Sequence, residues 1–158
     1  MVTPPVSLSP SSASTFEQCP RRFRYSAIDQ IAEPASNATA KGTAVHRSLE
    51  LLFATVERGQ RTRELASGFL SQACEELAQD GTLSSIADFP GLTRFTALAE
   101  TSLDGYFSME DPNEPVAIMT ETKLTRLLGQ GELRGIIDRV DESPDGSISI
   151  IDLKTGKP

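Results

Sequence analysis

The sequence predicts a mixed α/β fold in which helices come first and strands follow. Apolar residues recur at helical spacing in three stretches, at about 43–57, 61–79 and 90–107. A run of turn-forming residues at 111–115 (DPNEP) then breaks the pattern. Beyond it, three stretches rich in Val, Ile, Leu and Thr predict strands at 116–128, 131–142 and 147–153. These strands are expected to form an antiparallel meander. The length of 158 residues favours a single domain.

Shorter elements precede these helices. Ser9 followed by Pro10 is typical of a helix start, so a short helix is expected from there to about residue 18. Residues 20–30 (PRRFRYSAIDQ), which begin with a proline, predict a second short helical piece. Residues 33–40 (EPASNATA) are expected to form a loop.

The turn between the last two predicted strands fixes their register. Residues 144–146 (PDG) match a three-residue hairpin loop that ends in a left-handed glycine, which pairs Ser143 with Ser147. Continued along the strands, this register places Asp138 opposite Asp152. Directly opposed residues have Cβ atoms about 4.5–5.5 Å apart, so the two carboxylates are expected to be neighbours.

Two like charges at that spacing need compensation. Lys154 lies two residues beyond Asp152 and therefore on the same face, where it can neutralise one carboxylate. A divalent cation that prefers oxygen ligands, Mg²⁺ or Mn²⁺, would suit both. A solvent-facing hairpin with an ordinary Asp–Lys pair is the alternative. An apolar floor is expected on the same face, formed by Ile136, Val140, Ile148 and Ile150.

Composition excludes several classes of protein. No apolar run is long enough to cross a membrane, no signal peptide is recognisable, and two cysteines do not make a disulfide scaffold, so a cytoplasmic location is expected. The formal charge of −7 argues at first against nucleic acid. However, residues 64–118 hold ten acidic residues and one basic residue, whereas residues 1–63 hold eight basic and five acidic. A surface that faces phosphate therefore stays open.

Four motifs occur in order between residues 8 and 156. They are LSPS at 8–11 followed by Phe16, CP at 19–20, Phe23 and Tyr25; GTAVHRSLE at 42–50; GIIDRVD at 135–141; and IDLKTG at 151–156. In this order they resemble the RecB-like exonuclease family of the PD-(D/E)xK nuclease superfamily, including the N-terminal motif of its iron–sulfur members. The resemblance covers nearly the whole chain.

The resemblance implies a restriction-endonuclease-like α/β core that hydrolyses DNA phosphodiester bonds with Mg²⁺ or Mn²⁺. By motif position, His46, Asp138 and Asp152 correspond to the metal ligands, with the backbone carbonyl of Leu153 as a further one, and Lys154 to the catalytic lysine. Such an ion neutralises phosphate charge and lowers the pKa of bound water. The implied role is an exonuclease in DNA repair or recombination, with DNA and a helicase or other repair protein as partners and no membrane.

Three residues near this site have a second interpretation. His46, taken alone, is better explained as a structural histidine at the edge of a helix core face, and the family motif reverses that preference. Glu50 lies one turn further along and either supports His46 or is a surface carboxylate. Glu121 in the first long strand either lines the same cleft or pairs with Lys or Arg across the sheet.

The N-terminal motif supplies a further set of candidates. Cys19 corresponds to the first of four cysteine ligands of a 4Fe–4S cluster, but Cys74 does not fit the pattern of the others, so a cluster is expected only in a longer protein. Arg21, Arg22 and Arg24 either contact DNA phosphates or solvate a helix.

The family continues beyond its K-T-G motif, whereas this sequence stops at Pro158. We therefore expect residues 1–158 to be the N-terminal portion of a single RecB-like nuclease domain. Its helical part would span about 9–110 and its strand part, with the metal site, about 115–158, while the C-terminal part of the fold is missing and apolar surface is exposed. A non-catalytic DNA-binding or assembly module with the same fold, and a fragment inactive through truncation, are the alternatives.

Overall fold

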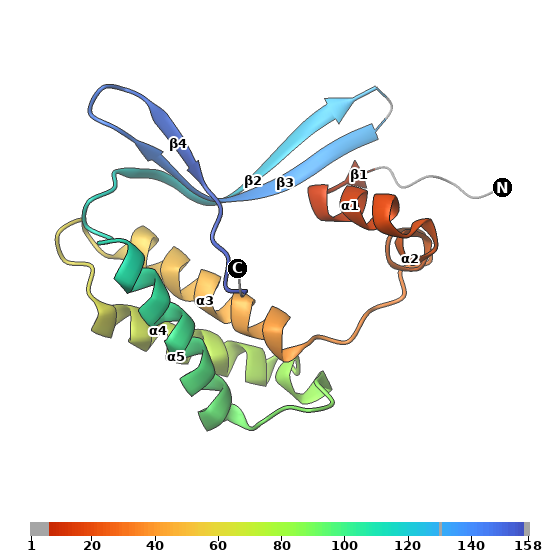
Figure 1. The fold of residues 1–158 in the computed structure, drawn as a ribbon, viewed down its shortest axis with the longest axis horizontal. Helices are drawn as coiled ribbons and strands as arrows, with labels where there is room; N and C mark the ends of the chain where they lie inside the picture. Colours follow the sequence, from red (N-terminus) through yellow and green to blue (C-terminus); the bar gives the residue numbers. More distant parts are fainter. Residues whose placement is uncertain (1–6, 130, 157–158) are drawn as a thin grey trace. The chain divides into compact units, whose positions relative to one another are not determined.

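The structure is a computed structural model that describes residues 7–129 and 131–156 (Figure 1). It is a mixed α/β structure in which, apart from the two-residue strand β1, the helices precede the strands as the sequence predicts. The elements in chain order are β1 (Ser7–Leu8), α1 (Pro10–Gln18), α2 (Pro20–Phe23), the π-helix η1 (Arg24–Ile28), α3 (Asn37–Thr55), α4 (Arg63–Gln79), the 3₁₀ helix η2 (Leu83–Ser85), α5 (Leu92–Met109), β2 (Ala117–Leu128), β3 (Gly131–Glu142) and β4 (Ile148–Ile151).

Residue contacts divide the chain into two compact units. Unit 1 consists of residues 1–33 and 122–137, and unit 2 of residues 34–121 and 138–158. Strands β2 and β3 each contribute residues to both units. The prediction of a single domain stays a prediction.

Unit 1 contains the short N-terminal elements. Ser9 caps α1 as expected, because its hydroxyl accepts a hydrogen bond from the Ser12 amide at 3.1 Å and Pro10 occupies the first turn. The rings of Phe16 and Phe23 pack edge to face, with their centroids 5.3 Å apart. Strand β1 pairs in parallel with β3, with Ser7 opposite Glu132, so the sheet is mixed rather than purely antiparallel.

Unit 2 has a helical core of α3, α4 and α5, in which α3 packs against both of the other helices (Figure 1). Helix α3 begins at Asn37, so the predicted loop over 33–40 is wrong in its second half. The reason is local: the Ser36 hydroxyl accepts a hydrogen bond from the Thr39 amide at 3.1 Å and caps the helix earlier than the apolar pattern indicates. The largest fully buried side chains are Phe95, Leu52, Leu70, Leu83, Leu103, Cys74 and Ser48.

The β3–β4 hairpin confirms the predicted register. The Ser143 amide donates to the Ser147 carbonyl at 2.9 Å, and Gly146 has a φ of +81°. The ladder pairs Arg139 with Ile151 and Val140 with Ile150, antiparallel. Strand β4 ends at Ile151, two residues earlier than predicted, so the ladder stops one pair short of Asp138 and Asp152.

The expected apolar floor is only partly covered. Val140 is buried, whereas Ile148 and Ile150 in unit 2 are exposed, and so is Ile136 in unit 1. The expectation of exposed apolar surface is therefore met on strand β4. No helix in the described part of the chain is long and apolar enough to cross a membrane.

Candidate metal centre

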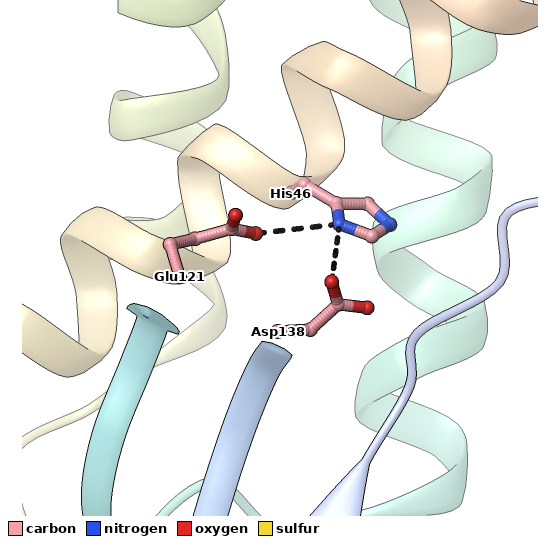
Figure 2. A group of neighbouring side chains, drawn as sticks. All are labelled: His46, Glu121 and Asp138. Atoms are coloured by element: carbon pink, nitrogen blue, oxygen red, sulfur yellow. Dashed lines mark ion pairs between the residues drawn. The ribbon is translucent and has the colours of Figure 1, made fainter. Parts of the chain in front are cut away.

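Three side chains from three elements of unit 2 point toward one another (Figure 2). His46 comes from α3, Glu121 from β2 and Asp138 from β3. The Nδ1 atom of His46 lies 3.4 Å from Oε1 of Glu121 and 3.6 Å from Oδ1 of Asp138. The three residues can each direct one ligand atom so that all three atoms lie within 4.8 Å of one another.

The helix core sets the position of His46. Its neighbours Val45 and Leu49 are buried, whereas His46 lies at the edge of that face and keeps 26% of its side chain exposed. A histidine at such an edge reaches the space beside the core without entering it. The sequence pattern predicts this edge position.

Glu121 is held in an unusual backbone conformation. Its φ is +42°, in the left-handed region that non-glycine residues rarely adopt. Burial raises the pKa of its carboxyl group, and the nearby Asp138 carboxylate raises that pKa further, while His46 opposes both effects. The Glu121 and Asp138 carboxylates thus lie together although the Glu121 backbone is strained and the charge on Glu121 is disfavoured.

Asp138 is fixed from a second direction. Its Oδ2 atom accepts a hydrogen bond from the Leu153 amide at 2.6 Å, and only 12% of its side chain is exposed. The other oxygen is left toward His46. Asp138 is therefore the most buried carboxylate of the group and is held by hydrogen bonding as well as by charge.

The donor set fits a divalent metal ion. One imidazole nitrogen and two carboxylate oxygens within 4.8 Å are donors that Mg²⁺, Mn²⁺ or Zn²⁺ accept. The same residues line a narrow pocket together with Glu50, Phe53 and Leu153. Leu49 and Phe53 of α3 contribute apolar surface to its wall, and such surface strengthens electrostatic interactions nearby.

Asp152 and Lys154 lie outside this group. They form an ion pair with each other at 2.8 Å, and their side chains are 67% and 77% exposed. The Asp152 hydrogen bond raises the pKa of the Lys154 ammonium. Because β4 ends at Ile151, the segment that follows turns its alternate residues, Leu153 and Thr155, inward and leaves this pair outside.

Leu153 contacts the site through its amide, and the ligand role that the resemblance implies for its carbonyl stays a prediction. Its side chain packs against the hydrophobic core of the helices, and its N–H binds Asp138. Glu50 is engaged elsewhere as well, since it accepts a hydrogen bond from Arg47 at 2.7 Å. Glu50 thus lines the pocket but stays outside the group of three.

Unit 1 contains the N-terminal candidates. Cys19 is an exposed free thiol between α1 and α2. Arg22 is paired with Glu33 at 2.9 Å and Arg24 with Asp29 at 3.3 Å. Arg21 instead lies over the Tyr25 ring at 5.6 Å. Of the three arginines, two already bind a carboxylate within their own unit.

The sequence reasoning names Glu121 as a candidate neighbour of the site but does not name Arg139. Glu121 contacts His46 and lines the same pocket, which is the first of the two interpretations given for it. Arg139 is a buried arginine next to Asp138, and only the motif position hints at it. One signal in the sequence points to Glu121. It lies on the strand directly before the strand of the GIIDRVD motif, and two consecutive strands joined by a short turn lie side by side.

The family model described as the PD-(D/E)XK nuclease superfamily matches residues 7–158. No curated protein and no solved structure matches the chain. Members of this superfamily are usually nucleases and use divalent metal ions. The matched range spans nearly the whole sequence, and the chain belongs to the PD-(D/E)XK nuclease superfamily.

Proposed function

We propose that this chain belongs to a RecB-like, Mg²⁺- or Mn²⁺-dependent DNA exonuclease that acts in DNA repair or recombination. The observation that supports it most is the convergence of His46, Glu121 and Asp138 from a helix and two strands. The order of the four sequence motifs supports the RecB-like branch, with DNA as substrate and a helicase or other repair protein as partner.

The proposed roles follow from chemistry and position. His46, Glu121 and Asp138 hold the ion through one nitrogen and two oxygens, and the Leu153 amide keeps Asp138 oriented. A divalent ion at this position supplies charge neutralisation for the scissile phosphate and a bound water of lowered pKa. Asp152 serves as a further ligand and Lys154 as the cation that orients water and stabilises developing negative charge.

Lys154 keeps its proton in this role. The hydrogen bond to Asp152 raises the pKa of Lys154, so the ammonium stays charged at neutral pH. With 77% of its side chain exposed, the ammonium reaches solvent and a phosphate that enters from outside. A divalent ion at the site would compete with Lys154 for the Asp152 carboxylate, which would leave the ammonium free for a phosphate.

The remaining proposals concern unit 1 and the cell. Cys19 is exposed and free, which leaves it available as one ligand of a 4Fe–4S cluster in a longer protein, whereas Cys74 is buried in the helical core of unit 2. Iron and sulfide analysis of the longer protein tests this. Arg21, which lies over Tyr25, is the first candidate for a phosphate contact. A cytoplasmic location is proposed with this function.

A nuclease assay tests the main proposal. Linear single- and double-stranded DNA are incubated with the protein and Mg²⁺ or Mn²⁺, with EDTA as the metal-free reaction. We expect D138N, D152N and K154A each to lower the rate at least about 100-fold, because each removes a group acting on the ion or the phosphate. E57Q, which changes an exposed carboxylate remote from the group, is the control and keeps wild-type activity.

One observation favours a second function. Asp152 and Lys154 pair with each other outside the metal group. This arrangement also suits a non-catalytic DNA-binding module that keeps the fold. In that case wild type and K154A bind DNA equally in a filter-binding assay and neither cuts it with either metal.

A further inference from the structure

Arg139 is the residue directly after Asp138, and it is a buried cation. Only 3% of its side chain is exposed. Its guanidinium donates to both carboxylate oxygens of Glu110, at 2.5 and 3.1 Å, and to Asp141 at 2.9 Å. It also donates to the Tyr106 hydroxyl at 3.2 Å. All of these residues belong to unit 2.

These contacts join strand β3 to two helices. Tyr106 lies on α5, and Glu110 caps the C-terminal end of that helix. The guanidinium carbon also lies 4.7 Å from the centre of the Phe53 ring on α3. Phe53 is about two turns along α3 from His46, so the arginine packs against the helix that supplies the histidine.

A second arginine reinforces the contact with Phe53. The guanidinium carbon of Arg61 lies 4.4 Å from the same ring centre, and Arg61 donates to the carbonyls of Val56 and Pro112. Phe53 therefore has a cation–π partner on each of two neighbouring segments. This fixes the ring against which Arg139 packs.

The fork of an arginine cannot be replaced by lysine at such a site. Glu110 and Asp141 each accept hydrogen bonds from N–H groups in the plane of the guanidinium. A lysine ammonium cannot reproduce this planar set of donors. Removing the cation would leave two partly buried carboxylates without their partner. The backbone of β3 at residue 139 is thus held by charge, hydrogen bonds and ring packing together.

We infer that Arg139 is a positioning residue that holds Asp138 at the metal site by anchoring β3 to α3 and α5. Its guanidinium is engaged by Glu110, Asp141 and Tyr106, so its effect on the site passes through the backbone that it shares with Asp138. The link to catalysis rests on the proposed function. Groups that orient metal ligands without binding the metal typically contribute 10- to 100-fold to metal affinity.

The test compares R139K with R63K. Arg63 also bridges carboxylates, those of Glu100 and Asp104, in the same unit, but it lies on α4 and is not adjacent to a site residue. Mn²⁺ binding is measured by calorimetry on the 158-residue chain, with circular dichroism to establish folding. We expect R139K to bind Mn²⁺ about 10-fold more weakly than wild type and R63K to bind it normally.

Two further measurements separate positioning from simple loss of stability. In the metal-free protein, amide hydrogen exchange at residues 138–142 is expected to speed up in R139K and to be unchanged in R63K. In the nuclease assay, R139K is expected to need about 10-fold more Mn²⁺ for half-maximal rate, with an unchanged KM for DNA. Folded R139K with the Mn²⁺ affinity and exchange rates of R63K would overturn the inference.

A second variant covers the case in which R139K does not fold. E110Q keeps Arg139 but weakens its strongest partner, and it is expected to shift Mn²⁺ affinity and exchange in the same direction; wild-type values in folded E110Q would overturn the inference. If wild type itself binds no Mn²⁺, the proposed function fails. The exchange comparison between R139K and R63K then decides the positioning role by itself.

Discussion

At the scale of single residues, Glu121 combines the largest local costs of the site. Its left-handed φ of +42° is a conformation that costs a non-glycine residue on the order of 1 kcal/mol. Its carboxyl is partly buried and lies near the Asp138 carboxylate, so its pKa is raised. Such costs are typical of residues retained for a ligand that is bound later.

The first prediction concerns E121Q in the presence of EDTA. A carboxyl whose pKa is raised by folding stabilises the protein below its unfolded pKa, and this contribution is lost as the pH rises through the folded pKa. At pH 8 wild-type Glu121 is charged in a site that disfavours the charge, whereas glutamine stays neutral. We therefore expect the free energy of unfolding of E121Q to exceed that of wild type by about 1 kcal/mol at pH 8. Urea unfolding at several pH values measures this.

The pH dependence separates this explanation from others. The stability difference between E121Q and wild type should shrink toward pH 4, where Glu121 is protonated in both states. E57Q, at an exposed carboxylate, should show no such dependence. An advantage of E121Q that is equal at pH 4 and pH 8 would contradict the role of the Glu121 charge.

The second prediction concerns Gly42, one turn before His46 on α3. A Cβ atom there would meet the Thr155 Oγ1 at 3.1 Å, whereas a Cβ at Gly68 on α4 would meet nothing within 4 Å. Replacing a helical glycine by alanine ordinarily stabilises by about 1 kcal/mol. We expect this gain for G68A and little or none for G42A in thermal unfolding.

Thr155 provides the control for Gly42. In a T155A background the hydroxyl is gone, so G42A should regain a stabilisation like that of G68A, with a coupling between positions 42 and 155 of at least about 0.5 kcal/mol. Additive effects of G42A and T155A would mean that the close approach has no energetic weight.

Residue-level chemistry was only partly predictable. The register from Ser143 and Ser147 is confirmed by the ladder, because turn geometry and side-chain alternation are local. The contact of Glu121 with His46 depends on how β2 meets α3, which no short-range pattern encodes. The outward Asp152–Lys154 pair follows from the end of β4 at Ile151, and the alternation of the sequence does not show where pairing stops.

At the scale of elements, capping and pattern predict most boundaries. Strand β3 spans Gly131–Glu142, the range that its composition predicts. The start of α3 was missed because one hydroxyl, that of Ser36, extends the helix through residues whose composition suggests a loop. Strand β1 has only two residues and is defined by its pairing with β3, so the local sequence does not predict it.

The third prediction concerns the turn that sets the β3–β4 register. Gly146 has a φ of +81°, and its amide donates to the Ser143 carbonyl at 2.8 Å. An alanine in that conformation is disfavoured by about 1–2 kcal/mol, and asparagine by less. We expect G146A to lower the free energy of unfolding by about 1 kcal/mol and G146N by less than half of that.

The control for this turn is a glycine with an ordinary φ. Gly135 in β3 has no positive φ, and a Cβ there would meet nothing within 4 Å. G135A should therefore change stability by no more than about 0.5 kcal/mol. Equal destabilisation by G146A and G135A in urea unfolding would contradict the strained turn.

At the scale of the whole molecule, the net charge of −7 is an average over segments of very different charge. The acidic stretch 64–118 covers α4, α5, the segment between them and the residues from the end of α5 to the start of β2. Part of that charge is already paired, since Arg63 binds Glu100 and Asp104. The acidic residues of the metal group come from other elements, so the average charge neither supports nor excludes a phosphate ligand.

The last prediction links the metal to the stability of the whole molecule. An ion that binds only the folded state stabilises it by about 2.7 kcal/mol at a concentration 100 times its Kd. Mn²⁺ should therefore raise the melting temperature of wild type and leave that of D138N unchanged.

L103A opens a cavity at a side chain that is 0% exposed and should lower the free energy of unfolding by about 2–5 kcal/mol. L98A on the same helix, at a side chain that is 48% exposed, should lower it little. Because Leu103 is not one of the three ligands, L103A should show the full Mn²⁺ increment from its lower baseline. A metal increment that vanishes in folded L103A would mean that the site depends on the core as a whole rather than on the three ligands and their anchors.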